Sequence, residues 1–167
     1  MLDSLKLGVY TPNMRTKSVN NMDAKAREIA SSCACFKLRK ASRAVTQFYD
    51  AALQESGLKV TQLTLLVSLT LAGPVPIGTL ADELVMDRTT LTRNVELLVR
   101  DGLAEVVQGK DKRMKLLQST EKGRAILDKA IPLWEQAQAA LVSRLGKQNW
   151  TDLSQKLAAV TAMTVIG

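Results

Sequence analysis

Residues 87–118 limit the possible folds of this chain more than any other segment. Asp87 is placed to cap a helix that runs to about Arg100 and is stopped by Gly102. The apolar positions of this helix share one face, at Leu91, Val95 and Leu98. Two segments typical of short strands follow, LAEVVQ and RMKLLQ, and the basic turn GKDK joins them. A helix followed directly by a short hairpin predicts a wing.

The segment before this helix completes a larger pattern. A helix is expected from Thr61, as its cap, to Leu71, and the sequence Gly73-Pro74-Val75-Pro76 then breaks it around a very short strand. The apolar residues of a third, short helix are Leu80, Ala81 and Leu84. This order of elements can push a helix into the major groove of DNA while the wing reaches the flanking minor groove. We therefore expect a winged helix-turn-helix DNA-binding domain over residues 58–119.

Long helical patterns flank this domain on both sides. One helix is expected over residues 23–57, and further helices over residues 120–167, where Asn149 or Thr151 is expected to cap the last one. Both flanks carry more apolar surface than a small domain can cover, which predicts a homodimer. The fold class is then mainly α, a winged helix-turn-helix domain with N- and C-terminal helices forming a helical dimerisation region. Residues 1–22 are expected to form an N-terminal arm, either disordered or packed on a partner subunit.

Composition narrows the classes of function. The chain has 23 Lys and Arg residues against 16 Asp and Glu, a net charge of +7, which favours an anionic partner. It has no histidine, no Gly-rich phosphate loop and no clustered metal ligands, so no enzyme, metal or cofactor is expected. It has no run of about 18 apolar residues, and residues 1–21 lack the apolar block of a signal peptide. We therefore expect a cytoplasmic protein without a membrane partner.

The helix after Asp87 and the wing carry polar groups that suit DNA binding. On the helix these are Arg88, Thr89, Thr90, Thr92, Arg93 and Asn94, and on the wing they are Lys110, Asp111, Lys112 and Arg113. Near a helix N-terminus, hydroxyls and backbone N–H groups can reach phosphates, and Arg93 can reach guanine edges. The alternative is an ordinary solvated helix face. A basic hairpin tip directly after that face favours the DNA interface.

The segment MDRTTLTRNVELLVRDGLAEVVQGKDKRMKLLQSTEKG, residues 86–123, resembles the core of the MarR family. The likeness lies in the DRTTLTR recognition helix, the GL turn, the D-x-R wing and the TEKG that opens a dimerisation helix. It implies a dimeric, sequence-specific regulator of transcription, generally a repressor, on a pseudo-palindromic double-stranded operator. It also implies that Arg113 enters the minor groove while Asp111 holds its guanidinium in an ion pair. The alternative for this pair is a surface salt bridge worth less than about 1 kcal/mol.

MarR-type regulators are generally released from DNA by a small aromatic or phenolic ligand or by cysteine oxidation. The segment CFKLRKASRAVTQFY resembles the first helix of the organic-hydroperoxide-sensing branch, with Cys35 at the sensing position and Tyr49 as its hydrogen-bond partner. Other tyrosines of that branch are replaced here by Arg39 and Val60, and Arg39, one turn from Cys35, could itself support a thiolate. The alternative is that Cys33 and Cys35 are small buried hydrophobes.

A ligand would instead bind between the dimerisation helices and the winged domain. The residues expected to line such a pocket are Arg39, Arg43, Tyr49 and Leu66, where an arginine could hold a carboxylate. The competing class of function is a non-enzymatic helical adaptor whose basic face meets an acidic protein. The two classes differ in one observable, because a duplex-binding protein loses affinity steeply as the salt concentration rises.

Overall fold

The computed structural model describes residues 21–111 and 113–163, and the chain separates into two units, residues 1–42 and 43–167. The first unit contains α1 (Asn21–Ser32) and the beginning of α2 (Ala34–Ala52). Nearly every described side chain of this unit is exposed. The part of the expected N-terminal arm before Asn21 lies outside the described residues, and Asn21 and Met22 themselves begin α1.

The single helix expected over residues 23–57 is wrong in one respect, because two helices meet at Cys33. The hydroxyls of Ser31 and Ser32 both donate to the carbonyl oxygen of Glu28, at 3.0 and 2.7 Å. Adjacent serines that bind a helix carbonyl in this way are a recognised cause of helix bends. The apolar period of this segment predicts helical structure on both sides of Cys33 but does not indicate the break between the two helices.

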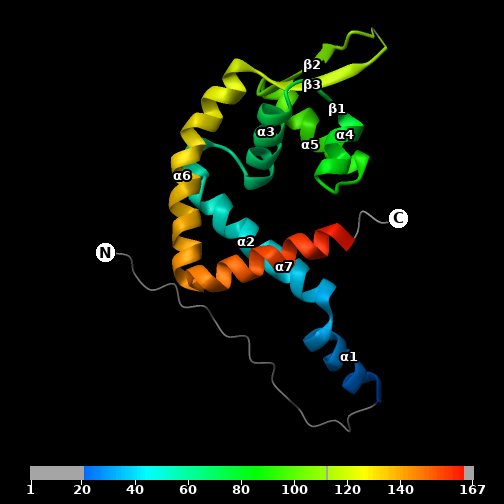
Figure 1. Cartoon of the computed structure of the whole chain (residues 1–167), viewed down its shortest axis with the longest axis vertical. Coiled ribbons are helices and arrows are strands. Elements are labelled where there is room, and N and C mark those ends of the chain that lie inside the picture. Colours follow the sequence, from blue (N-terminus) through cyan, green and yellow to red (C-terminus); the bar gives the residue numbers. More distant parts are fainter. Residues whose placement is uncertain (1–20, 112, 164–167) are drawn as a thin grey trace. The chain divides into compact units, whose positions relative to one another are not determined.

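The second unit contains the remaining elements (Figure 1). After α2 they are the short 3-10 helix η1 (Gln54–Ser56), α3 (Val60–Ala72), β1 (Val75–Pro76), α4 (Ile77–Glu83), α5 (Arg88–Arg100), β2 (Ala104–Gln108), β3 (Lys115–Ser119), α6 (Glu121–Leu145) and α7 (Lys147–Met163). The strands form an antiparallel sheet in the order β1-β3-β2, with Val106 opposite Leu117. The expected fold class, a mainly helical protein with a winged helix-turn-helix, is confirmed.

Two helix starts in this unit agree with the sequence. At α5 the Asp87 carboxylate accepts a hydrogen bond from the Thr90 N–H at 2.8 Å. At α6 the Thr120 hydroxyl accepts one from the Gly123 N–H at 3.0 Å. Each cap satisfies a backbone donor that the first turn of a helix leaves without a partner.

The expected cap of α3 at Thr61 is wrong, because the helix begins one residue earlier, at Val60. The Val60 N–H donates to the carboxylate of Asp50 on α2, at 2.8 Å. The N–H of Lys59 donates to the side-chain oxygen of Gln62, at 2.9 Å. The cap therefore comes partly from another helix, and periodicity within residues 61–71 could not reveal it.

The expected cap of the last helix, Asn149 or Thr151, is also wrong. α7 begins at Lys147, directly after Gly146, whose φ of 84° lets the chain turn between α6 and α7. Asn149 instead donates to the carbonyl oxygen of Leu145, at 2.8 Å, and Thr151 donates to that of Lys147, at 3.1 Å. Both side chains therefore donate to helix carbonyl oxygens, and neither caps the backbone N–H groups of the first turn of α7.

One apolar core joins the winged domain to the N-terminal half of α6. Its largest fully buried side chains are Leu53, Leu66, Leu69, Leu80, Leu91 and Leu98. Leu127 and Ala130 bring α6 into the same cluster. Burying each leucine contributes roughly 1.5–3 kcal/mol, so these contacts fix the position of α5 relative to the wing. None of the described helices is long and apolar enough to cross a membrane.

Candidate nucleic-acid interface

The outer face of α5 is polar because its apolar residues are used for the core. Leu91, Val95 and Leu98 are buried on one side of the helix. At 100° per residue, Thr89, Arg93, Glu96 and Arg100 fall on the opposite side, and all four are exposed. Arg88 and Thr90 are also exposed, in the first turn. The N-terminal half of the helix therefore presents Arg88, Arg93 and hydroxyl groups to solvent, where the helix dipole favours anions.

Two of the expected contact residues lie at the sides of this face instead. Thr92 is half-buried, donates its hydroxyl proton to the Arg88 carbonyl at 2.7 Å, and lines a groove between α5 and the wing. Asn94 is half-buried on the other side, in a small hollow shared with Thr61 and Thr64 of α3. The side chain of Asn94 therefore faces α3 in this structure, and a contact with DNA would require it to turn outward.

Gly78 of α4 lies against a residue of the candidate interface, a contact that the sequence did not indicate. A Cβ atom at this position would lie 3.3 Å from a terminal nitrogen of the Arg88 guanidinium. The absence of a side chain therefore lets Arg88 lie close against α4. A glycine in the first turn of a short helix was the available signal, since glycine there often marks the close approach of another group.

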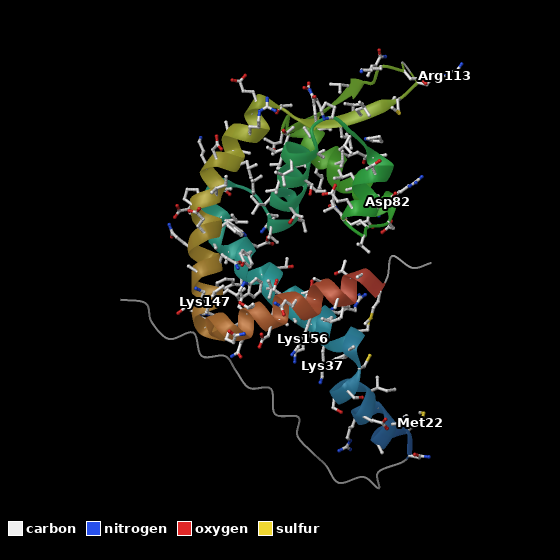
Figure 2. All side chains as sticks on the ribbon, in the orientation of Figure 1. Met22, Lys37, Asp82, Arg113, Lys147 and Lys156 are labelled. Carbon is white, nitrogen blue, oxygen red and sulfur yellow. The ribbon has the colours of Figure 1, made fainter. Side chains whose placement is uncertain are left out.

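The wing extends the cationic surface beyond the helices. Figure 2 shows Arg113 at the far end of the β2–β3 hairpin, directed away from the domain. Lys110, Asp111 and Arg113 are all exposed there, whereas Lys112 lies outside the described residues. The hairpin is closed by backbone hydrogen bonds from Gly109 to Met114 and from Met114 to Asp111, both 2.8 Å.

The expected ion pair within the wing is not formed in the structure. The Asp111 carboxylate accepts a hydrogen bond from the Arg113 backbone N–H, at 2.9 Å. Among the described residues, no salt bridge joins this carboxylate to the Arg113 guanidinium. An aspartate that binds the N–H two residues later stabilises the turn itself. Asp111 therefore shapes the loop, and the guanidinium of Arg113 extends into solvent.

The carboxylate of Asp87 is held in its charged form at the start of α5. Hydrogen bonds from the Thr90 side chain and backbone lower the pKa of Asp87 below the ordinary value of an aspartate. This negative charge sits at the positive end of the helix dipole, which favours it. Arg100, at the other end of α5, pairs with Asp101 at 3.0 Å. Arg88 and Arg93, nearer the helix N-terminus, form no salt bridge within the part of the chain that the structure describes.

A separate apolar groove of about 480 Å³ lies between α3 and α6. Its lining residues are Val60, Leu63, Thr64, Val67, Ser68, Leu127, Ile131 and Trp134. Leu66, expected in a pocket, is instead fully buried in the core, because it lies on the inner side of α3. Arg43 is exposed and does not line the groove, and Arg39 belongs to the other unit. The spacing of Leu127, Ile131 and Trp134 on one helix face was the signal for this site.

The residues expected to sense oxidants, Cys33, Cys35 and Tyr49, differ from one another in burial. Tyr49 is buried, which raises the pKa of its hydroxyl, and this hydroxyl donates to the side-chain oxygen of Gln138 on α6. Its single proton is thus used within the second unit and is not available to a thiolate. Both cysteines are free thiols, with Cys33 half-buried and Cys35 exposed. The description of Cys35 as a buried hydrophobe is therefore wrong.

Comparisons with known proteins agree on one relationship. Residues 56–114 match the model of the MarR family. The transcriptional regulator MosR of M. tuberculosis is 37% identical, over 81% of this chain and 97% of MosR, with a TM-score of 0.71. Its structure in complex with DNA is 40% identical over 77% and 98% of the two chains, with a TM-score of 0.64. The transcriptional repressor CouR of Rhodococcus jostii RHA1, bound to a 23-mer duplex, is 25% identical over 80% and 95%, with a TM-score of 0.71. No curated protein sequence matches the chain.

Proposed function

This chain belongs to the MarR family of DNA-binding transcriptional regulators, which are not enzymes, and from that premise we propose that it is a homodimeric repressor released from its operator by a small effector. The observation that carries the proposal is the polar face of α5, where Arg88 and Arg93 make no salt bridge with any described residue, beside a wing that ends in Arg113. The order of α5 followed by a basic wing is that of domains in which the helix enters the major groove and the wing reaches the neighbouring minor groove. CouR, of the same fold, is a repressor bound to duplex DNA.

Each side chain has a role that its chemistry supports. Arg93 lies at the centre of the outer face of α5, where a guanidinium can bind the O6 and N7 atoms of guanine. Arg88 and the hydroxyl of Thr89, in the first turn, are suited to phosphate oxygens. Arg113, free of Asp111, is suited to a narrow minor groove with its negative potential. The lysines of the wing add attraction to phosphates that carries no sequence information.

DNA binding is tested with a duplex selected by the protein itself from a random pool. We expect the affinity for this duplex to fall steeply with salt and to drop about tenfold or more in Arg93→Ala. Lys129→Ala on α6 is the matched control, since it removes one exposed positive charge outside the interface. An affinity that is independent of salt, or equal losses in both variants, would support the adaptor function instead.

The homodimer is supported by apolar side chains that the second unit leaves uncovered. None of the residues of α7 is buried, yet Leu153, Leu157 and Val160 recur at spacings of four and three. Each is about 40% exposed. Light scattering during size-exclusion chromatography should give twice the mass of the chain, and Leu157→Lys should reduce it. The exposed Lys156→Gln on the same helix should leave the dimer intact.

The effector is proposed to bind in the groove between α3 and α6. No charged side chain is among the described residues that line the groove, which favours a neutral aromatic or phenolic compound over a carboxylate held by arginine. Trp134 is 39% exposed at this site, so ligand binding should change its fluorescence in a Trp150→Phe background. Val67→Phe should fill part of the groove without adding a second tryptophan, and should abolish both the fluorescence response and the release of DNA. A compound that releases DNA equally from this variant acts at another site.

Oxidation of Cys35 is a second candidate for the signal, favoured by the exposure of this thiol. The thiolate would be oxidised by a peroxide to sulfenic acid and then capped by a small thiol. Peroxide should release the wild-type protein and Cys33→Ser from DNA but leave Cys35→Ser bound. Release of Cys35→Ser by peroxide would contradict a sensing role for this residue.

A further inference from the structure

Val85, in the turn between α4 and α5, has a backbone conformation that a valine rarely adopts. Its φ is 51°, and no other non-glycine residue within 21–111 and 113–163 has a positive φ. The turn is closed by hydrogen bonds from the N–H groups of Val85 to Asp82 at 3.2 Å and of Met86 to Ala81 at 2.9 Å. This is the helix ending at which glycine or asparagine normally occupies the left-handed position. A β-branched side chain is strained there.

Packing within the domain does not compensate for this strain. The side chain of Val85 is 53% exposed, whereas its neighbours Leu84 and Met86 are partly buried against the core. A glycine in the same place would keep the turn and remove the strain. The fold alone therefore gives no reason for an apolar, branched side chain at this position.

The position of Val85 relates it to the interface. It lies two residues before Asp87, the cap of α5, and therefore at the N-terminal end of that helix, beside the exposed Arg88 and Thr89. The wing follows the opposite end of α5, through Gly102. Val85 therefore places an exposed apolar side chain at the N-terminal end of α5, next to polar groups that are suited to bind DNA.

DNA offers one apolar group to a side chain in the major groove, the C5 methyl of thymine. We propose that Val85 makes a van der Waals contact with the methyl group of a thymine in each half-site and so contributes to operator specificity. This inference rests on the proposed DNA binding through α5. The strain in the turn is then retained because the valine contributes to DNA recognition.

The test compares Val85→Gly with the wild-type dimer on a duplex selected by the wild-type protein. Loss of the contact should lower affinity about fivefold, the effect of removing an apolar contact of one to two methyl groups. The melting temperature should stay the same or rise, because glycine adopts this φ freely. A merely structural role for Val85 predicts the opposite, a lower melting temperature together with weaker binding. Leu71→Ala, which shortens an 81% exposed side chain on α3, is the control and should change neither quantity.

Replacing thymines one at a time by deoxyuridine identifies the contact, since this removes only the methyl group. One such replacement in each half-site should lower wild-type affinity several-fold and leave the affinity of Val85→Gly unchanged. If both proteins respond equally at every thymine, or if Val85→Gly binds as tightly as wild type, the inference is wrong. Failure of the wild-type protein to bind any selected duplex would instead overturn the proposed function.

Discussion

The first turn of α6 lies so close to the start of the wing that a Cβ atom on Gly123 would be 2.0 Å from the carbonyl oxygen of Leu103. The same carbonyl accepts a hydrogen bond from the N–H of Thr120, at 3.1 Å. No side chain fits between these two backbones. The glycine of the TEKG sequence is therefore required where the winged domain joins its long helix.

We expect Gly123→Ala to destabilise the protein. Alanine would gain up to about 1 kcal/mol in helix propensity, but the overlap with a backbone atom can be relieved only by moving α6 or the hairpin. A net loss of about 1–3 kcal/mol in the free energy of unfolding should appear in urea denaturation. Lys129→Ala, exposed on the same helix, should stay close to wild type. A Gly123→Ala protein of unchanged stability would show that the close approach is not rigid.

Leu66 and Val67 are adjacent in α3 but should respond differently to shortening. Leu66 is fully buried, so Leu66→Ala should lower the free energy of unfolding by about 2–5 kcal/mol. Val67 lines the groove and is 37% exposed, so Val67→Ala should lower the free energy of unfolding by clearly less than Leu66→Ala does. Thermal or urea unfolding of both variants measures the difference. Equal losses would contradict the assignment of Leu66 to the core.

The pH dependence of stability should carry a contribution from Asp87. Because the folded-state pKa of Asp87 is lowered, its ionised form stabilises the fold at pH values above the ordinary pKa of aspartate. This contribution is lost as the pH falls through the lowered pKa. Asp87→Asn keeps an oxygen that can cap α5 but does not titrate there. The melting temperature of wild type should therefore fall more between about pH 5 and pH 2 than that of Asp87→Asn.

Arg113→Ala should weaken operator binding about tenfold or more without lowering the melting temperature. The side chain is exposed at the tip of the wing, and its guanidinium makes no ion pair with the described residues. Its loss should therefore leave the stability of the fold unchanged. It removes a cation that is suited to the minor groove. Fluorescence anisotropy with the selected duplex measures this effect. Unchanged affinity would exclude Arg113 from the interface.

Asp111→Asn tests the role of the wing aspartate. Asparagine can still accept the hydrogen bond from the Arg113 N–H, so the turn should be preserved. If Asp111 only shapes the loop, DNA affinity should be unchanged or slightly higher, because one negative charge is removed. A large loss of affinity would instead support a direct ion pair between Asp111 and Arg113 in the complex with DNA.

The sequence alone determined the features that depend on neighbours along the chain. The cap at Asp87, the apolar stripe of α5, the hairpin after Gly102 and the cap at Thr120 are all local, because helix capping and side-chain period act within a few residues. The positive charge of the wing likewise follows directly from its lysine and arginine residues. These local signals were sufficient to predict the winged helix-turn-helix, whereas the assignment of the outer face of α5 to DNA binding stays a prediction.

Only the tertiary structure decided features that join distant segments. The start of α3 depends on Asp50 of α2, the inward side of α3 makes Leu66 a core residue, and the groove exists because α3 packs on α6. The need for Gly123 arises from Leu103, and the strain at Val85 from the path of the chain between two packed helices. Such contacts depend on how whole elements pack together, and the period of side chains within one element does not encode them.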